Sequence, residues 1–343
     1  MDLNNFIILS ITLLSLIIIF KKFNFLIDNI DFSDHKKIGI QNKSPIILGG
    51  IYLTFSMFFL GSEIYSFLKI ICLLILFLGL SSDRNYLSNP LVRLILQVLI
   101  IFIFIYYENL SIRSISINFF DSLLEIKFVN IFFTLFCFAI LMNGSNFLDG
   151  LNGLLSGYYL FVLGSLVYLN FSYDEINMSH HELTNLIFMT LIIFFMLNIF
   201  GLIYLGDSGS YVISMIVGFI LIKESQNNFT ISPYYVVLLL WYPAFENLFS
   251  LIRRSFKKKN VSEADKLHLH QLIFRYFKQK KIFNKKIINT STSFLILIFN
   301  FPVFIIANIN YSHTITLVST IFIYLFFYLF IYFYLISFFR KSL

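Results

Sequence analysis

The sequence predicts an all-α, polytopic integral membrane protein with about eleven transmembrane helices in one transmembrane domain, residues 1–343. Only 13% of the residues are charged and 58% are hydrophobic, whereas soluble domains are about 25% charged. Apolar runs that approach the roughly 20 residues of a membrane-spanning helix recur along the whole chain. The basic residues concentrate between alternate runs, as the loops on one side of a membrane would require.

The first apolar run, 3–20, is expected to be an uncleaved transmembrane helix. A secretory signal peptide carries basic residues before its apolar stretch, but Asp2 is the only charge there, and Lys21 and Lys22 come afterwards. Ten further spans are predicted from the apolar runs. They are 46–62, 64–80, 91–107, 128–142, 152–169, 183–200, 208–222, 234–251, 291–309 and 313–337.

The distribution of Lys and Arg predicts that the N-terminus lies outside and the C-terminus lies in the cytoplasm. With this orientation, 21 of the 25 basic residues fall on the cytoplasmic side. The excess of basic residues on the cytoplasmic side has two explanations. It reflects only the positive-inside rule and attraction to anionic lipid, or it also gathers anionic substrates. The loops predicted to form it are 21–45, 81–90, 143–151, 201–207 and 252–290.

Five polar clusters interrupt the apolar sequence, and all five fall on the predicted cytoplasmic side. Three carboxylates in these clusters, Asp83, Asp149 and Asp207, lie next to the ends of predicted spans. A carboxylate close to the membrane is costly unless it is paired, hydrated or bound to metal, so these three indicate a functional site. The clusters read HKKIGIQNKSPIILGG (35–50), GLSSDRNYLSNPLVRLILQ (79–97), NGSNFLDGLNG (143–153), YLGDSGS (204–210) and DKLHLHQL (265–272).

In their order and spacing, these clusters resemble the MraY/WecA family of polyprenyl-phosphate N-acetylhexosamine-1-phosphate transferases, glycosyltransferase family 4. The match is closer to the WecA-like branch and extends from about His35 to Leu272. The residues that carry it are Asn143, Asn146, Asp149, Gly150 and Gly153 of a nucleotide motif, Leu205 to Ser210 of a metal motif, Asp265, His268 and His270 of a histidine loop, and Arg93 with Gln97.

The resemblance implies transfer of N-acetylhexosamine 1-phosphate from a UDP-sugar to polyprenyl (undecaprenyl) phosphate, with release of UMP. Such a step initiates the synthesis of O-antigen or another surface glycan. It implies a multi-pass protein of the bacterial inner membrane with its active site facing the cytoplasm. The expected partners are UDP-N-acetylhexosamine, undecaprenyl phosphate and the bilayer, with Mg²⁺ or Mn²⁺ as cofactor and no nucleic acid. Oligomeric state is open, with a homodimer as one alternative.

Three positions depart from the family pattern. Ser82-Asp83 stands where the family usually has two adjacent aspartates, Asn152 where it often has aspartate, and Gln271 where it has a third histidine. The first departure matters most, because a mechanism that needs twin acids does not transfer to one acid.

The candidate catalytic residues are Asp83, Asp149 and Asp207. Asp207 is the leading Mg²⁺ ligand, since Mg²⁺ prefers hard oxygen ligands; its alternative role is to cap the following helix. Asp83 is a second metal ligand, or it positions or deprotonates the lipid phosphate; covalent catalysis by Asp83 is a further alternative.

The candidate substrate-binding residues fall into two groups. Amide and carboxylate side chains suit the uracil edge and ribose hydroxyls, although turn formation is an alternative for them. Imidazole and cationic side chains suit pyrophosphate and sugar oxygens, with a solvated loop histidine as the alternative. Zinc is disfavoured because Cys72 and Cys137 lie in apolar runs elsewhere. The candidates are Asn143, Asn146 and Asn152 in the first group, and His268, His270, Lys37 and Arg93 in the second.

Three other functions are alternatives. A phospho-N-acetylmuramoyl-pentapeptide transferase would use the same chemistry on a larger donor, but the histidine loop fits UDP-GlcNAc or a modified relative better. A transporter or flippase would place ionisable groups along a path through mid-helix positions, whereas Asp83, Asp149 and Asp207 lie at helix ends on one side. A non-catalytic lipid-binding scaffold is the remaining alternative.

Overall fold

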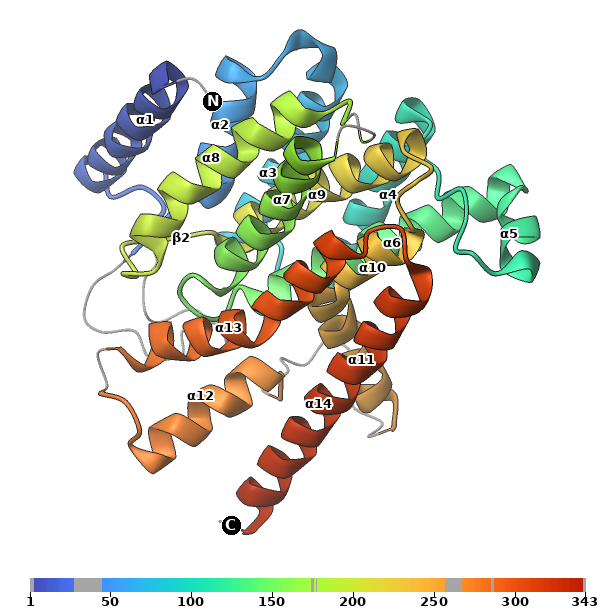
Figure 1. Ribbon diagram of the computed structural model, residues 1–343. Helices are drawn as coiled ribbons and strands as arrows, with labels where there is room; N and C mark the ends of the chain where they lie inside the picture. The colour runs from blue at the N-terminus through green and yellow to red at the C-terminus, as the bar shows by residue number, and fades with distance from the viewer. Residues whose placement is uncertain are drawn as a thin grey trace.

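The computed structural model describes residues 3–27, 45–173, 176, 178–256, 267–284 and 287–341, which form an all-α bundle with one two-stranded pairing (Figure 1). In chain order the elements are α1 (Leu3–Lys22), β1 (Ile46–Ile47), α2 (Gly49–Leu60), η1 (Glu63–Tyr65), α3 (Ser66–Asp83), α4 (Pro90–Glu108), α5 (Asn118–Leu124), α6 (Lys127–Leu148), α7 (Leu154–Ser172), α8 (His181–Asn198), β2 (Ile203–Tyr204), α9 (Gly206–Asn227), α10 (Pro233–Leu239), α11 (Trp241–Phe256), α12 (Leu269–Lys280), α13 (Ile288–Ile309) and α14 (Thr314–Lys341).

The predicted class, an all-α polytopic membrane protein, is confirmed. Within the described ranges, nine helices are long and apolar enough to cross a membrane, or ten if α10 and α11 form one bent span. Eleven were predicted. The difference arises because α2 has 12 residues, about 18 Å of helix, and because the run 234–251 bends by 74° between α10 and α11.

A short parallel pairing precedes two helices that reach the polar clusters. Ile46 of β1 pairs with Ile203 of β2, and Ile47 pairs with Tyr204. The predicted helix 46–62 therefore begins only at Gly49. The backbone N–H of Leu48 extends the pairing by donating to the Tyr204 carbonyl at 3.0 Å. Because β1 leads into α2 and β2 leads into α9, the pairing places the first turns of these two helices together.

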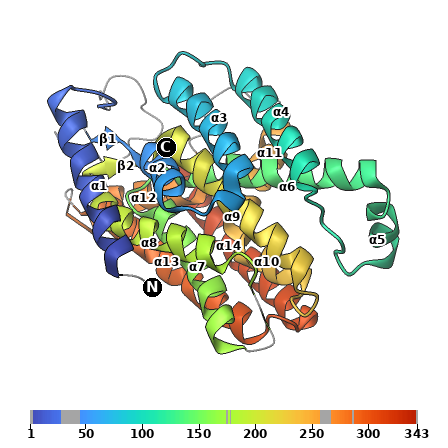
Figure 2. The ribbon, with the colours of Figure 1, turned by 90° about the horizontal axis from the view of Figure 1, so that it is seen from above.

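Helix α9 lies at the centre of the bundle, among α2, α3, α6 and α7 (Figure 2). In its most apolar stretch 83% of the residues are buried, against 11% in α1 and 17% in α14. Small residues permit this close approach, as is usual between membrane helices. A Cβ at Gly50 would lie 2.8 Å from the Ser208 carbonyl carbon, and a Cβ at Gly79 would collide with the Ser208 backbone.

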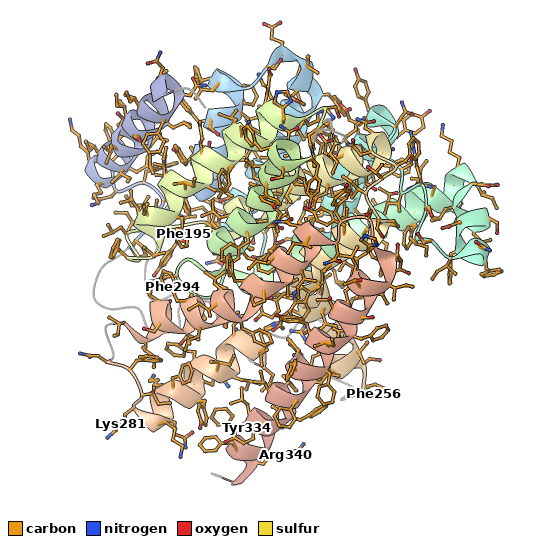
Figure 3. All side chains as sticks on the ribbon, viewed as in Figure 1. Phe195, Phe256, Lys281, Phe294, Tyr334 and Arg340 are labelled. Atoms are coloured by element: carbon orange, nitrogen blue, oxygen red, sulfur yellow. The ribbon has the colours of Figure 1, made fainter. Side chains whose placement is uncertain are left out.

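The outer helix α14 exposes large apolar side chains, whereas basic residues lie near the ends of α12 and α14. Along α14, large apolar residues such as Phe322, Phe326 and Phe330 are exposed, as expected for a lipid-facing helix. Figure 3 shows Lys281 and Arg340 towards the same edge of the molecule, near the last turns of α12 and α14. Tyr334 packs against Tyr276 of α12, with 6.5 Å between the ring centroids.

Helices α6 and α11 are also in backbone contact, because a Cβ at Gly144 would collide with the Pro243 carbonyl. We expect Gly144→Ala to lower the thermal unfolding midpoint in detergent, at an overpacking cost of about 1–3 kcal/mol. The matched control is Gly164→Ala in α7, where the new Cβ would lie 3.4 Å from Phe188. That substitution should be neutral or stabilising, since alanine favours helix by about 1 kcal/mol. Equal midpoints for the two variants would contradict the close contact between α6 and α11.

Candidate active site

The polar clusters predicted from the sequence meet where several helices begin or end. The last turn of α3, the first turns of α4 and α9, the last turns of α6 and the start of α12 supply the side chains described below. Helix ends suit such a site because their first N–H groups and last carbonyls lack partners within the helix.

Asp207 lies in the first turn of α9, with 7% of the residue exposed. Its Oδ2 accepts hydrogen bonds from Ser82 Oγ at 2.5 Å and from Arg93 Nη1 at 2.9 Å. Arg93 Nη1 also donates to Ser82 Oγ at 2.5 Å, which closes a triangle. The guanidinium therefore neutralises a largely buried carboxylate. The alternative role of Asp207 as helix cap is wrong, since Leu205 is the N-cap residue and makes no side-chain cap bond.

Asp83, the last residue of α3, provides the missing cap from a neighbouring helix. Its Oδ1 accepts the Asp207 N–H at 2.7 Å and its Oδ2 accepts the Ser208 N–H at 3.1 Å. A carboxylate at a helix N-terminus satisfies unpaired donors and complements the helix dipole. Gly206 makes room for it, because a Cβ there would lie 2.8 Å from Asp83 Oδ2 and the residue has φ +72°.

The nucleotide motif lies partly within a helix. The sequence placed 143–151 in a loop, but α6 continues to Leu148, so Asn143 and Asn146 share one helical face. Asn146 Nδ2 donates to the Tyr211 hydroxyl at 3.2 Å, and its Oδ1 accepts from Ser210 Oγ at 3.3 Å. Asn143 Nδ2 lies 3.4 Å from Gln97 Oε1. This face therefore points towards α9 and α4, and Asp149 follows at the C-cap of α6.

Asn152 makes its contacts away from this group. Its backbone N–H donates to Asn289 Oδ1 on α13 at 2.7 Å. Its side-chain amide lies against Gly201, where a Cβ would be 2.8 Å from Asn152 Nδ2. The turn after α6 is thus fixed to α13 and to the chain before β2.

His268 and His270 lie against the end of α6. Their rings are nearly parallel, with an interplanar angle of 12° and centroids 5.7 Å apart. The Phe147 ring of α6 is 4.6 Å from the His268 ring, and a Cβ at Gly150 would lie 2.9 Å from His270 Nε2. Both histidines are buried, at 3% and 0% exposure, which excludes the alternative of a solvated loop histidine.

Two residues at the site were missed by sequence reasoning, Tyr211 and Glu246. Tyr211 follows Asp207 by one helical turn and accepts from Asn146. Glu246 of α11 contacts the histidine loop, with its Oε2 2.9 Å from His268 Nδ1. A single acid in the apolar run 234–251 was the available signal. Lys37, with its neighbours His35 and Lys36, and Asp265 lie outside the described residues.

The acidic side chains at the start of α9 suit a hard divalent cation. Mg²⁺ is usually held by one or two protein carboxylates plus waters and substrate phosphates, and Asp83 and Asp207 bring two carboxylates to one helical turn. Within the described ranges, no group of three or more His, Cys, Asp or Glu residues is arranged around a metal position. Asp83 and Asp207 are the residues that could hold such a cation, with substrate oxygens completing its coordination.

An apolar cavity of about 390 Å³ lies between α6, α9, α10, α11 and α14. Its walls include Leu141, Gly218, Val237 and Leu325, together with the polar residues Ser111 and Ser225. Because Leu141 precedes Asn143 on α6, the cavity reaches to within one helical turn of the nucleotide motif.

Residues 65–225 match the profile of Glycosyl transferase family 4. Over this region, which is just under half of its length, the chain is similar to that family. The matched region includes Ser82, Asp83, Arg93, Asp149 and Asp207, whereas His268 and Glu246 lie beyond it.

Several curated proteins are similar to this chain. The probable undecaprenyl-phosphate N-acetylglucosaminyl 1-phosphate transferase of Bacillus subtilis (strain 168) is 23% identical over 280 residues, 79% of this chain and 76% of the relative. The undecaprenyl-phosphate α-N-acetylglucosaminyl 1-phosphate transferase of Yersinia pestis is 25% identical over 59% of this chain and 56% of the relative. The Thermotoga maritima enzyme of that name is 29% identical over 42% of this chain and 43% of the relative.

Proposed function

We propose that this family 4 enzyme transfers N-acetylhexosamine 1-phosphate from a UDP-sugar to polyprenyl phosphate and releases UMP. The observation that carries the proposal is the contact between α3, α4 and α9, which joins Asp83, Arg93 and Asp207 at the start of one helix. The named relatives, which act on undecaprenyl phosphate, support it.

In the proposed reaction, an oxygen of the lipid phosphate attacks the phosphorus that carries the sugar. The bond from that phosphorus to the bridging oxygen breaks, and UMP leaves with the bridging oxygen. Such phosphoryl transfer depends mainly on positioning and on neutralising charge. Asp207 and Asp83 would hold Mg²⁺ or Mn²⁺, which neutralises pyrophosphate charge when bound. Arg93, fixed by Asp207 and Ser82, has the planar donors that suit phosphate oxygens.

The other site residues are proposed to bind the donor. The face of α6 with Asn143 and Asn146, followed by Asp149, suits the uracil edge and ribose hydroxyls. His268 and His270 suit the pyrophosphate and sugar oxygens. Asn152 stays a candidate for donor binding, with turn formation as the alternative, and its side-chain amide lies against Gly201. Asp83 positions the lipid phosphate or takes its proton, in addition to capping α9, and Lys37 remains a prediction outside the described residues.

The lipid substrate would be undecaprenyl phosphate, as the names of the relatives suggest. The apolar cavity between α6, α9, α10, α11 and α14 suits part of a polyprenyl chain, because hydrocarbon is favoured in an apolar environment. A homodimer also stays a prediction, which light scattering of the detergent-solubilised protein would check.

The proposed topology counts the short α2 and the bent pair α10–α11 as spans in addition to the nine long helices, which gives eleven. It places the N-terminus outside and the active site facing the cytoplasm of a bacterial inner membrane. Cysteines introduced at the exposed positions Ser88 and Ser172 should then react with impermeant thiol reagents from opposite sides of oriented vesicles. Ser88 should be the one on the cytoplasmic side. Reaction of both from one side would refute this orientation.

The test of the proposed reaction is UMP release by the purified protein with Mg²⁺, undecaprenyl phosphate and a panel of UDP-sugars. UMP should appear only when the lipid phosphate and a UDP-N-acetylhexosamine are both present, with UDP-GlcNAc or a modified relative preferred. Release with UDP-N-acetylmuramoyl-pentapeptide alone would indicate the peptidoglycan branch. Absence of UMP with every donor would favour the transporter or scaffold alternatives.

A further inference from the structure

A buried carboxylate on α11 contacts the histidine loop. Glu246 is 0% exposed, and its two oxygens have different partners. Oε2 lies 2.9 Å from His268 Nδ1, and Oε1 accepts the backbone N–H of Leu269 at 3.0 Å. One carboxylate thus contacts both the imidazole and the first residue of α12.

This contact determines which nitrogen of His268 carries a proton. An ionised carboxylate only accepts hydrogen bonds, so Nδ1 must be the donor. In a neutral imidazole the other nitrogen, Nε2, is then unprotonated and can take a proton; in the charged form it is a donor. Carboxylate–histidine pairs of this kind orient the ring and fix its tautomer in many enzymes.

The orientation of the His268 ring is fixed from two further sides. The Phe147 ring lies 4.6 Å from it, and the His270 ring lies 5.7 Å from it in a nearly parallel plane. Phe147 directly follows Asn146 on α6. The ring is therefore held beside the proposed nucleotide-binding face, with its Nδ1 edge turned to α11.

We infer that Glu246 is a positioning residue, which fixes the tautomer and orientation of His268 so that Nε2 serves the phosphate group that is transferred. This inference rests on the proposed function and deepens it. Glu246 acts through His268 and does not itself contact the substrate. The bond to Leu269 alone would only anchor α12, so the experiment must separate the two contacts.

Glu246→Gln separates them because the amide oxygen can still accept the Leu269 N–H. The amide nitrogen, however, donates where the carboxylate accepted, so it favours the His268 tautomer protonated on Nε2. We expect kcat to fall about 10–100-fold, as is typical when such a partner is lost, with KM for the UDP-sugar changed less than about threefold. Glu246→Asp keeps an acceptor-only group and should recover part of the lost kcat.

A double-mutant cycle tests whether Glu246 acts through the histidine. In a His268→Gln background, adding Glu246→Gln should cost less than about a further threefold, because the group it positions is already absent. If Glu246→Gln lowered kcat by the full amount in the His268→Gln background as well, the inference would be overturned. So would wild-type kcat in Glu246→Gln.

The matched control is Glu224→Gln in α9. Glu224 is 1% exposed, accepts the His180 backbone N–H at 2.7 Å and accepts from Asn228 Nδ2 at 3.1 Å. It lies near the last turn of α9, whereas Asp207 lies in the first. Glu224→Gln should leave kcat unchanged. An equal loss of kcat there would mean that any buried Glu→Gln change disturbs the enzyme, and would overturn the assignment to Glu246.

Nitrogen NMR of the protein labelled with ¹⁵N-histidine gives a readout independent of turnover. The His268 signals, assigned by their absence in His268→Gln, should show a protonated Nδ1 in the wild type and a shift of that proton to Nε2 in Glu246→Gln. An unprotonated Nδ1 in the wild type would overturn the inference. Absence of UMP release by the wild type would instead overturn the proposed reaction, and the NMR result would still decide whether Glu246 fixes the tautomer.

Discussion

Asp207→Asn is expected to reduce UMP release by about 10³-fold or more, since the carboxylate is both the proposed metal ligand and the partner of Arg93. The amide keeps the size of the side chain but loses the negative charge that accepts from Arg93 Nη1 and Ser82 Oγ. The measurement is UMP release over a Mg²⁺ titration, with the unfolding midpoint recorded in parallel. Wild-type turnover at low Mg²⁺ in this variant would contradict the assignment.

The matched control for Asp207→Asn is Asp121→Asn in α5. Asp121 also bonds to a serine hydroxyl, Ser114 Oγ at 2.8 Å, and it accepts the Ile115 N–H at 2.7 Å. It lies before α6, whereas the proposed nucleotide motif lies at the end of that helix. Asp121→Asn should leave turnover unchanged. A comparable loss in both variants would show that general disruption, not a missing metal ligand, explains the result.

Asp83→Asn should have the second-largest effect, a loss of about 10²–10⁴-fold in turnover if Asp83 acts on the lipid phosphate. Stability should also fall, by about 1 kcal/mol, because the amide has one acceptor oxygen for the two N–H groups of Asp207 and Ser208. Both quantities are measured on the same preparation, as UMP release and as the unfolding midpoint.

Ser82→Ala is the comparison for Asp83→Asn. It removes one hydrogen bond to Asp207 Oδ2 but leaves that of Arg93, so turnover should fall by less than about tenfold, the effect of roughly 1 kcal/mol. Equal and mild losses in the two variants would mean that the end of α3 has only a structural role.

Most of the helical architecture could be predicted, because long apolar runs between charged loops leave the backbone few alternatives in lipid. The exceptions arise from tertiary contacts. Residues 46 and 47 form a two-residue strand because Ile203 and Tyr204 lie opposite, and two residues carry no periodicity to reveal it. The bend after Leu239 falls inside a continuous apolar run. Residues 143–148, which were predicted to lie in a loop, continue α6, and Gly144 among them is in close contact with α11.

The acidic and amide residues of the site were predictable from the free-energy cost of placing such side chains near a membrane and from the family resemblance. Their hydrogen-bond partners were not predictable. Asp83 caps a helix that begins more than a hundred residues later in the chain. Which helix end faces which carboxylate depends on the packing of α3 against α9, and local sequence does not encode it. The contact between Glu246 and His268 could not be predicted for the same reason, since only the fold brings α11 next to His268.

The glycine contacts around the start of α9 also restrict motion. At Gly79 the backbone of α3 nearly touches that of Ser208, and at Gly50 the backbone of α2 does the same. Sliding either helix by one residue would bring a larger side chain into that contact, and closely packed interiors do not deform gradually. Asp83 and Asp207 therefore belong to one rigid unit. Closure around a sugar nucleotide would therefore leave the separation of the two acids constant through the cycle.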